Sequence, residues 1–115
     1  NDIFYFFESK SIPNYTTDKI ISGEIHVLEK DLIAKKNITG KIVLIESADP
    51  GYDWIFSHNI IGLVTKYGGA NSHMAIRSNE LGIPAAIGVG LLYDSLAKTS
   101  IIEIDSISKK ILVYR

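Results

Sequence analysis

The chain has 115 residues, of which 46% are hydrophobic and 22% are charged, and its formal net charge is −1 at pH 7. This length and composition are typical of one globular domain and exclude a disordered chain or a coiled coil. The small net charge, with no block of like charges, argues against nucleic acid or an anionic membrane as a partner, and the absence of cysteine excludes disulfides and cysteine zinc sites.

The beginning of the chain differs from the rest. An apolar, aromatic run is followed by a polar stretch that contains Pro13, so we expect residues 1–19 to form a lead-in or linker segment ahead of a domain at residues 20–115. The aromatic run, Phe4 to Phe7, allows two interpretations: an edge strand of the domain, or a segment buried against another domain.

Signals for targeting and for membrane insertion are lacking in the sequence. No apolar run approaches the ~20 residues that cross a bilayer, and the apolar start has neither the basic region nor the cleavage site of a signal peptide. We therefore expect a cytoplasmic location. The only methionine is Met74, in the middle of the chain, so we expect the sequence to be a piece of a longer protein.

From residue 20 onward, short apolar runs alternate with amphipathic stretches. The sequence predicts strands at residues 20–28, 41–46, 60–65, 85–87, 101–104 and 110–114. The first alternates only partly and has an irregularity at Gly23, and the last two are expected to form a closing hairpin. Helices are expected at residues 52–58, 72–81 and 91–97. The second is the best defined, with Asn71 or Ser72 as its N-cap and Gly82 as its C-cap. Because strands outnumber helices, we expect an α/β domain with a mixed sheet.

The stretch after the third of these strands carries the most chemical information. A strand ends at Thr65, a glycine pair turns the chain, and His73 lies in the first turn of a helix. Gly68 and Gly69 permit positive φ and a close approach of backbone amides to an anion. The unpaired N–H groups and the dipole at the helix start favour a phosphate, and they disfavour a positive charge on the ring. This order predicts a nucleophilic histidine that carries a phosphoryl group.

Helical spacing divides the expected helix into two faces. A small-to-apolar stripe should face the core and consists of Met74, Ala75, Ser78 and Leu81. His73, Arg77 and Glu80 then share the other face, where we expect His73 to be exposed. Because helical side chains lean toward the N-terminus, Arg77 is expected to contact a phosphate on His73, together with Gly68, Gly69 and Ser72.

From these residues alone, a non-catalytic role for His73 stays open, because a histidine at a helix start is more often a cap or a surface residue. What favours catalysis is the ordered pattern Thr65-x-x-Gly68-Gly69-x-x-Ser72-His73-x-Ala75-Ile76, which continues through Glu80-Leu81-Gly82-Ile83-Pro84 to Gly88. The pattern resembles the swivelling phosphohistidine domain, or mobile domain, of the PEP-utilising enzymes, a family that includes phosphoenolpyruvate synthase and pyruvate phosphate dikinase. The resemblance extends more weakly over residues 20–114.

The resemblance implies a compact β/β/α sandwich that pivots between two active sites. In such a domain His73 accepts a phosphoryl group from ATP or phosphoenolpyruvate and passes it to pyruvate or another small acceptor, while Thr65 orients the ring. The implied partners are a nucleotide-binding domain and an acceptor-site domain of the parent protein. ATP and Mg²⁺ are expected at those partners, with no cofactor or metal bound by this chain, which is expected to be inactive alone.

The family pattern has one departure. Where the family commonly has Ala-Arg before Glu-Leu-Gly, this chain has Ser78 and Asn79, and Arg77 is a candidate replacement for the missing positive charge. Three alternatives therefore stay open: the carrier domain of a related small-molecule kinase, a non-catalytic interaction module that retains the fold, and a hydrolase with His73 as general base. The hydrolase is the least favoured, because no second catalytic group is apparent.

Four other polar residues invite a functional interpretation. His26 and His58 have no histidine or carboxylate at ligand spacing beside them, so we expect structural or exposed side chains and not metal ligands. Asp49 and Asp53 flank Pro50 and Gly51 and suggest a pair of carboxylates. We favour a turn or cap residue for Asp49 and a first-turn helix acid for Asp53.

Overall fold

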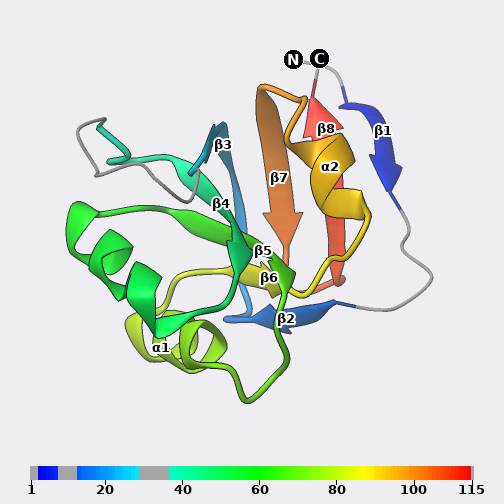
Figure 1. The fold of residues 1–115 in the computed structure, drawn as a ribbon. Helices are drawn as coiled ribbons and strands as arrows, with labels where there is room; N and C mark the ends of the chain where they lie inside the picture. The colour runs from blue at the N-terminus through cyan, green and yellow to red at the C-terminus, as the bar shows by residue number, and fades with distance from the viewer. Residues whose placement is uncertain (1–2, 8–12, 29–36, 115) are drawn as a thin grey trace.

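The computed structural model describes residues 3–7, 13–28 and 37–114, and for residues 3–7 it describes the backbone only. The strands in chain order are β1 (Ile3–Phe7), β2 (Asn14–Thr16), β3 (Ile20–Val27), β4 (Ile42–Ser47), β5 (Gly62–Tyr67), β6 (Ala85–Ile87), β7 (Ile101–Asp105) and β8 (Lys110–Tyr114). The helices are the 3₁₀-helix η1 (Pro50–His58) and the α-helices α1 (His73–Leu81) and α2 (Leu92–Leu96). Figure 1 shows their arrangement.

The strands form one mixed sheet with the order β1-β8-β7-β3-β4-β5-β6-β2. In its parallel half, β4 lies between β3 and β5, and β6 follows β5. The continuous apolar runs of β4 and β5 are buried, as is typical of parallel strands covered on both faces. In the antiparallel half, β7 and β8 form the expected hairpin, and β1 is the edge strand beside β8. At the opposite edge of the sheet, β2 pairs antiparallel with β6.

Strand β3 joins the two halves of the sheet. Its first part pairs antiparallel with β7, and its last part, from Ile25 onward, pairs parallel with β4. The irregularity that we expected at Gly23 is not a bulge, because the register with β7 continues through that residue. A Cβ atom at Gly23 would lie 2.8 Å from Cδ1 of Ile61, so the tip of Ile61 packs closely over the backbone of this glycine.

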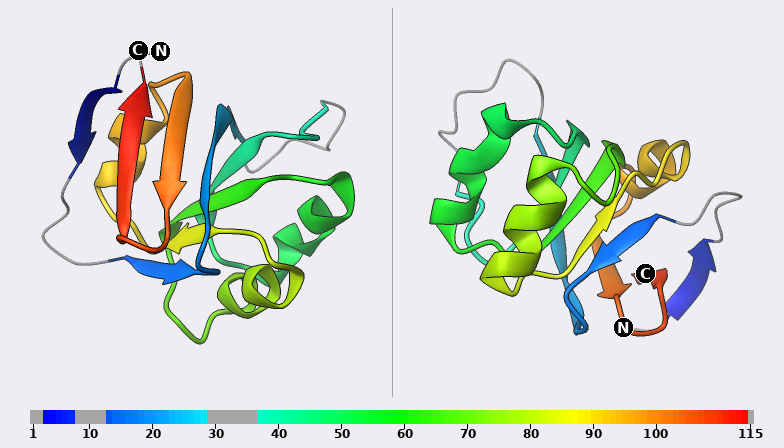
Figure 2. Two further views of the ribbon diagram at one scale, coloured as in Figure 1. Left: turned by 180° about the vertical axis from the view of Figure 1, so that it is seen from behind. Right: turned by 90° about the horizontal axis from the view of Figure 1, so that it is seen from below.

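The sheet separates two hydrophobic cores. On one face, η1 and α1 cover a core whose largest fully buried side chains are Ile38, Ile45, Ile55, Leu63, Met74 and Ile87. On the other face, α2 covers a core whose largest fully buried side chains are Ile42, Leu44, Leu96, Ile102, Ile104 and Ile111. The right-hand view of Figure 2 shows η1 and α1 on one side of the sheet and α2 on the other. Neither helix layer is large, so the central strands supply much of each core.

The expected elements agree with the structure apart from local differences. The stretch that we read as a loop contains β2, because pairing of residues 14–16 with β6 overrides a polar sequence. The edge-strand interpretation of Phe4 to Phe7 is confirmed by the pairing of β1 with β8. Leu81 was wrongly assigned to the core and is 45% exposed; it is the last residue of α1, whose buried residues are Met74, Ala75 and Ser78. The domain boundary at residue 20 stays a prediction.

The helices of the described ranges are short. None has the length and apolar character required to span a membrane. The two longest, η1 and α1, have 9 residues each. Their importance lies in their position, because both follow parallel strands that end at the same edge of the sheet, and they contact each other there (Figure 1).

Candidate phosphohistidine site

Helix α1 begins at His73, as the sequence predicted. The preceding residue, Ser72, is the N-cap, and its hydroxyl accepts a hydrogen bond from the backbone N–H of Ala75 at 3.4 Å. At the other end Gly82 is the C-cap in the left-handed conformation, with φ of 72°. The first N–H groups of an α-helix have no partner inside the helix, so the start of α1 is electropositive where His73 projects.

The glycine turn before α1 is held by close backbone contacts. Gly68 has φ of 132° and Gly88 has φ of 80°, and a Cβ atom at Gly88 would lie 2.4 Å from the carbonyl oxygen of Gly68. No L side chain fits at that approach. Gly69, in contrast, has open space around its Cα, with no atom within 4 Å of an added Cβ. The turn is thus fixed on its inner side and open on its outer side.

Thr65 is fully buried within β5 beneath this turn, and the strand continues to Tyr67, two residues beyond the end that we expected, because Tyr67 still pairs with Ser47 of β4. Its hydroxyl donates to the carbonyl oxygen of Tyr67 at 2.9 Å and accepts from the backbone N–H of Gly88 at 3.0 Å. These two hydrogen bonds tie the strand end to the glycine turn. Thr65 therefore shapes the turn that presents His73, and the direct hydrogen bond to the imidazole that the resemblance implies stays a prediction.

Asp53 of η1 joins His73 and Arg77 of α1 through one carboxylate oxygen. Its Oδ1 lies 2.8 Å from Nε2 of His73 and 3.1 Å from Nε of Arg77. The guanidinium of Arg77 also lies 5.8 Å from the ring centre of Phe56 and donates to Glu80 at 3.5 Å. The exposed fractions are 37% for His73, 44% for Asp53 and 35% for Arg77, so the group is open to solvent and to a partner.

The charges of this group favour an ionised carboxylate. Hydrogen bonds from His73 and then from Arg77 lower the pKa of Asp53 below its ordinary value. The same pair raises the pKa of Arg77, mainly through its hydrogen bond to Asp53. Asp53 and Arg77 therefore stay oppositely charged over the physiological range and hold the ring between two helices.

The prediction that His73, Arg77 and Glu80 share a face is confirmed, whereas the link to Asp53 was missed. Asp53 is a first-turn acid of η1, as expected, and Asp49 is its N-cap, accepting from the N–H of Gly51 at 2.9 Å. Nothing in the sequence spacing connects Asp53 to His73, because 20 residues separate them. The signal was topological: helices that follow adjacent parallel strands on one face of the sheet approach each other.

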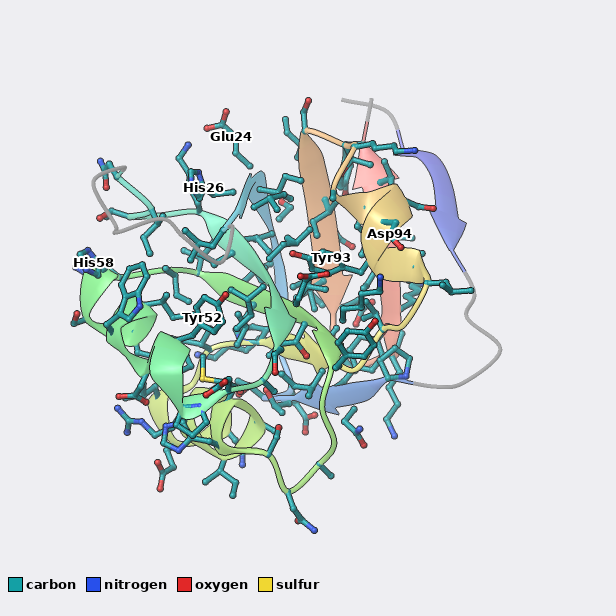
Figure 3. The ribbon with its side chains drawn as sticks, viewed as in Figure 1. Glu24, His26, Tyr52, His58, Tyr93 and Asp94 are labelled. Atoms are coloured by element: carbon teal, nitrogen blue, oxygen red, sulfur yellow. The ribbon has the colours of Figure 1, made fainter. Side chains whose placement is uncertain are left out.

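The two other histidines lie outside this group. His26 lies in β3, and His58 ends η1 with its ring 5.6 Å from the ring of Trp54 in an edge-on arrangement. Figure 3 shows the two histidines apart from each other. Across the described ranges, no group of three or more histidine or acidic side chains is arranged to hold a metal ion.

Comparison with known proteins bears directly on this arrangement. Residues 38–109, which contain η1, the glycine turn and α1, match the family described as PEP-utilising enzyme, mobile domain. The chain belongs to this family. The mobile-domain family thus covers every residue that we have assigned to the site, and the resemblance noted in the sequence is confirmed.

The similar proteins are named phosphoenolpyruvate synthases and a phosphoenolpyruvate-protein phosphotransferase. The chain is 37% identical over 73 residues to a phosphoenolpyruvate synthase of Aquifex aeolicus, covering 64% of this chain and 8% of that protein. It is 33% identical over 88 residues to the phosphoenolpyruvate synthase of Aeropyrum pernix, covering 75% of this chain and 10% of that protein. A phosphoenolpyruvate-protein phosphotransferase of Listeria monocytogenes is 38% identical over 53 residues, which are 46% of this chain and 9% of that protein.

A solved structure agrees with the family assignment. The solution structure of an Enzyme I protein (nEIt) superimposes with a TM-score of 0.52 at 27% sequence identity, over 65% of this chain and 31% of that one. The expected α/β fold is therefore confirmed. The chain spans only 8% to 10% of the length of the curated relatives described above, so it corresponds to one mobile domain within much longer enzymes.

Proposed function

We propose that this mobile domain carries a phosphoryl group on His73 within a phosphotransferase that resembles phosphoenolpyruvate synthase. One observation carries the proposal. His73 occupies the first position of α1, at an electropositive helix start, with its ring 37% exposed and bonded to a carboxylate within the family-matched residues. A partner active site can reach a ring in this position, and a histidine in a sealed core could not serve as a carrier.

In the first step, a ring nitrogen of His73 attacks a phosphorus of the ATP phosphate chain. A nitrogen–phosphorus bond forms, the bond from that phosphorus to its bridging oxygen breaks, and the remaining nucleotide leaves with the electron pair. In the second step, an oxygen of pyruvate enolate or of another small acceptor attacks the same phosphorus. The nitrogen–phosphorus bond then breaks and the ring recovers its lone pair. Phosphoenolpyruvate would load His73 by the reverse of this second step.

The residues around His73 have distinct parts in this scheme. The N–H groups at the start of α1 and the open side of Gly69 offer positive potential to the phosphoryl oxygens. Ser72 caps the helix and donates its hydroxyl proton to the carbonyl of Gly69 at 2.7 Å, which keeps the turn in place. Arg77 supplies a full positive charge beside the ring, since its guanidinium donates to the same Asp53 oxygen that contacts His73. Thr65 supports the glycine turn from beneath, and we expect it to orient the imidazole of His73.

The remaining parts of the reaction belong to other domains. A nucleotide-binding domain would present ATP, and an acceptor-site domain would bind pyruvate or another small molecule. Mg²⁺, which neutralises phosphate charge in such transfers, would act at those domains. The mobile domain alone should therefore neither bind ATP tightly nor turn over substrate, and isothermal titration that found micromolar ATP binding to this chain would contradict that assignment.

Two neighbouring functions share much of this scheme. The carrier domain of a small-molecule kinase would use the same His73 with a different acceptor, and Ser78 and Asn79 in place of the common Ala-Arg leave the acceptor open. A non-catalytic interaction module would retain the fold without phosphorylation. The identity to two phosphoenolpyruvate synthases supports pyruvate as the acceptor to test first.

The test uses a full-length protein that contains this chain, together with ATP or phosphoenolpyruvate labelled on the transferred phosphate. We expect one phosphate per chain, stable in alkali and labile in acid, as for phosphohistidine. His73→Ala should abolish the label, whereas the matched changes His26→Ala and His58→Ala should retain it. Labelling of His73→Ala at the normal rate would refute the carrier assignment, and a wild-type protein that takes no label would favour the interaction module.

A further inference from the structure

The carboxylate of Asp53 is hydrogen-bonded to the ring nitrogen of His73 that lies farthest from the backbone. Of the two nitrogens of histidine, Nδ1 adjoins the carbon that bears Cβ, and Nε2 is the outer one that a partner can approach. In this structure Nε2 of His73 lies 2.8 Å from Oδ1 of Asp53. Since an ionised carboxylate only accepts hydrogen bonds, Nε2 carries the proton here and its lone pair is not available.

A phosphoryl group on Nε2 and the Asp53 carboxylate exclude each other. Both are negatively charged, and both would need the space at the outer edge of the ring. At hydrogen-bond separation the repulsion between them is appreciable even near a solvated surface. Arg77, whose Nε lies 3.1 Å from Oδ1 of Asp53, is four residues from His73 on the same helix face, so its positive charge can meet the new negative charge.

We propose that Asp53 is a positioning residue that holds the unphosphorylated ring and is exchanged for the phosphoryl group when Nε2 is phosphorylated. Arg77 passes from the carboxylate to the phosphoryl oxygens in the same exchange. This inference rests on the proposed function of His73. It adds an antagonist to that site: Asp53 stabilises the unloaded domain and makes phosphohistidine a better donor, while Arg77 stabilises the loaded domain.

The exchange predicts effects of opposite sign for two residues that bind each other. If the Asp53–Arg77 pair only tied η1 to α1, removal of either partner would change the stability of the fold and leave the balance between loaded and unloaded His73 unaltered. If the exchange operates, removal of Asp53 shifts that balance toward phosphohistidine, and removal of Arg77 shifts it away. The sign of the shift therefore separates a positioning role from a purely structural one.

The balance can be measured on this chain with phosphoramidate as the phosphoryl donor. When the ring leaves Asp53 and moves its proton from Nε2 to Nδ1, Nε2 gains a free lone pair and attacks the phosphorus. A new nitrogen–phosphorus bond forms as the old one breaks, ammonia leaves, and the Nδ1 proton passes to solvent. At a fixed ratio of phosphoramidate to ammonium, phosphorus NMR gives the equilibrium ratio of phosphorylated to free His73. Fragment mass spectrometry at alkaline pH separates His73 from His26 and His58.

For Asp53→Asn we expect the ratio of phosphorylated to free His73 to rise about twofold to fivefold, because exposed charge pairs contribute free energies of that size. For Arg77→Gln we expect a comparable fall in the ratio. Arg77→Lys, which keeps the charge, should recover most of the loss. Asp49→Asn is the matched control: it makes the same change at the N-cap of the same 3₁₀-helix, where the Asp49 side chain accepts from the N–H of Gly51, and the ratio should not move. Thermal unfolding monitors each fold, and Asp53→Ser serves if Asp53→Asn unfolds.

The outcomes are distinguishable from one another. A ratio for Asp53→Asn that equals the Asp49→Asn value, or falls below it, overturns the exchange and leaves His73 as a carrier. Attachment of the phosphate to Nδ1 also overturns it, because Asp53 could then keep its hydrogen bond. A wild-type chain whose His73 takes no more phosphate than His26 and His58 contradicts the proposed function instead.

Discussion

The two faces of the parallel strands are built alike but differ in what they can do. Adjacent residues of β4 are fully buried on opposite sides, with Ile45 in the core beneath η1 and α1 and Leu44 in the core beneath α2. Each face also has an exposed ion pair: Asp53 with Arg77 on the first, and Lys66 with Asp94 at 3.2 Å on the second. Similar packing and similar charge therefore do not decide where a site forms.

The difference lies in how many helices meet and what their ends present. On the first face, η1 and α1 contact each other, and the start of α1 directs a histidine toward the acid of η1. On the second face, α2 has 5 residues and no side-chain cap. Figure 3 shows Tyr93 directed from α2 toward the sheet and Asp94 on the outer side. A nucleophile at a capped helix start, within reach of a second helix, distinguishes the first face.

Matched truncations in β4 give the largest effect that tests this comparison. Ile45→Ala and Leu44→Ala each remove a fully buried side chain, so each should lower the free energy of unfolding by about 2–5 kcal/mol in urea titrations. Only Ile45→Ala should also shift the ring signals of His73 in NMR spectra, because Ile45 supports the face that carries η1 and α1. Equal disturbance of His73 by both variants would mean that the faces are not independent.

The cap of α1 gives a smaller effect on the same face. Ser72→Ala removes the acceptor for the N–H of Ala75 and the donor to Gly69, so we expect a loss of about 1 kcal/mol in unfolding free energy. The control on the other face is Ser95→Ala, an exposed serine of α2, where the change should stay within about 0.5 kcal/mol. A loss at Ser95 as large as that at Ser72 would remove this distinction between the helices.

The two faces should also lose stability at opposite limits of pH. Burial, and then the charge of Asp105, raises the pKa of Tyr15, which packs on the second core, to about 12 from 10.0. Its contribution is complete below pH 10 and is lost as the pH rises through 12, because the unfolded chain deprotonates first. Tyr15→Phe should therefore reduce the alkaline loss of stability, as measured by unfolding between those limits.

The first face should respond at acid pH instead. Since the pKa of Asp53 is lowered, its contribution is present above the ordinary value of 3.8 and is lost as the pH falls through the lowered value. Asp53→Asn should flatten the acid limb of the stability profile and leave the alkaline limb unchanged. If Tyr15→Phe altered the acid limb, or Asp53→Asn the alkaline one, the assignment of these limits to separate faces would be wrong.

Rules that use only neighbouring residues predicted the fold correctly wherever the local preference of the sequence agrees with the tertiary structure. Apolar runs gave the central strands, and the serine and glycine caps placed α1 to within one residue of its observed start. They failed for β2, whose polar residues are held by pairing with β6, and for Leu81, which has the spacing of the buried stripe but is exposed at the end of α1. Both failures depend on contacts that no local window contains.

The candidate site was predictable in part for the same reason. The glycine turn, Ser72 and His73 are neighbours in sequence, so a short pattern describes them. The links of Thr65 to Gly88 and of Asp53 to His73 join residues that are 23 and 20 positions apart. Only the right-handed succession of parallel strands and helices brings these residues together, and their spacing gives no sign of it.

The most direct test of the central claim is to locate the phosphate on the intact protein. A full-length protein that contains this chain is incubated with ATP or phosphoenolpyruvate, digested at alkaline pH, and sequenced by electron-transfer mass spectrometry, which retains phosphohistidine. We predict one phosphate within this chain, on His73, which disappears when pyruvate is supplied in excess to the ATP-loaded protein. A phosphate on His26, on His58 or on a hydroxyl residue, with His73 unmodified, would contradict the account.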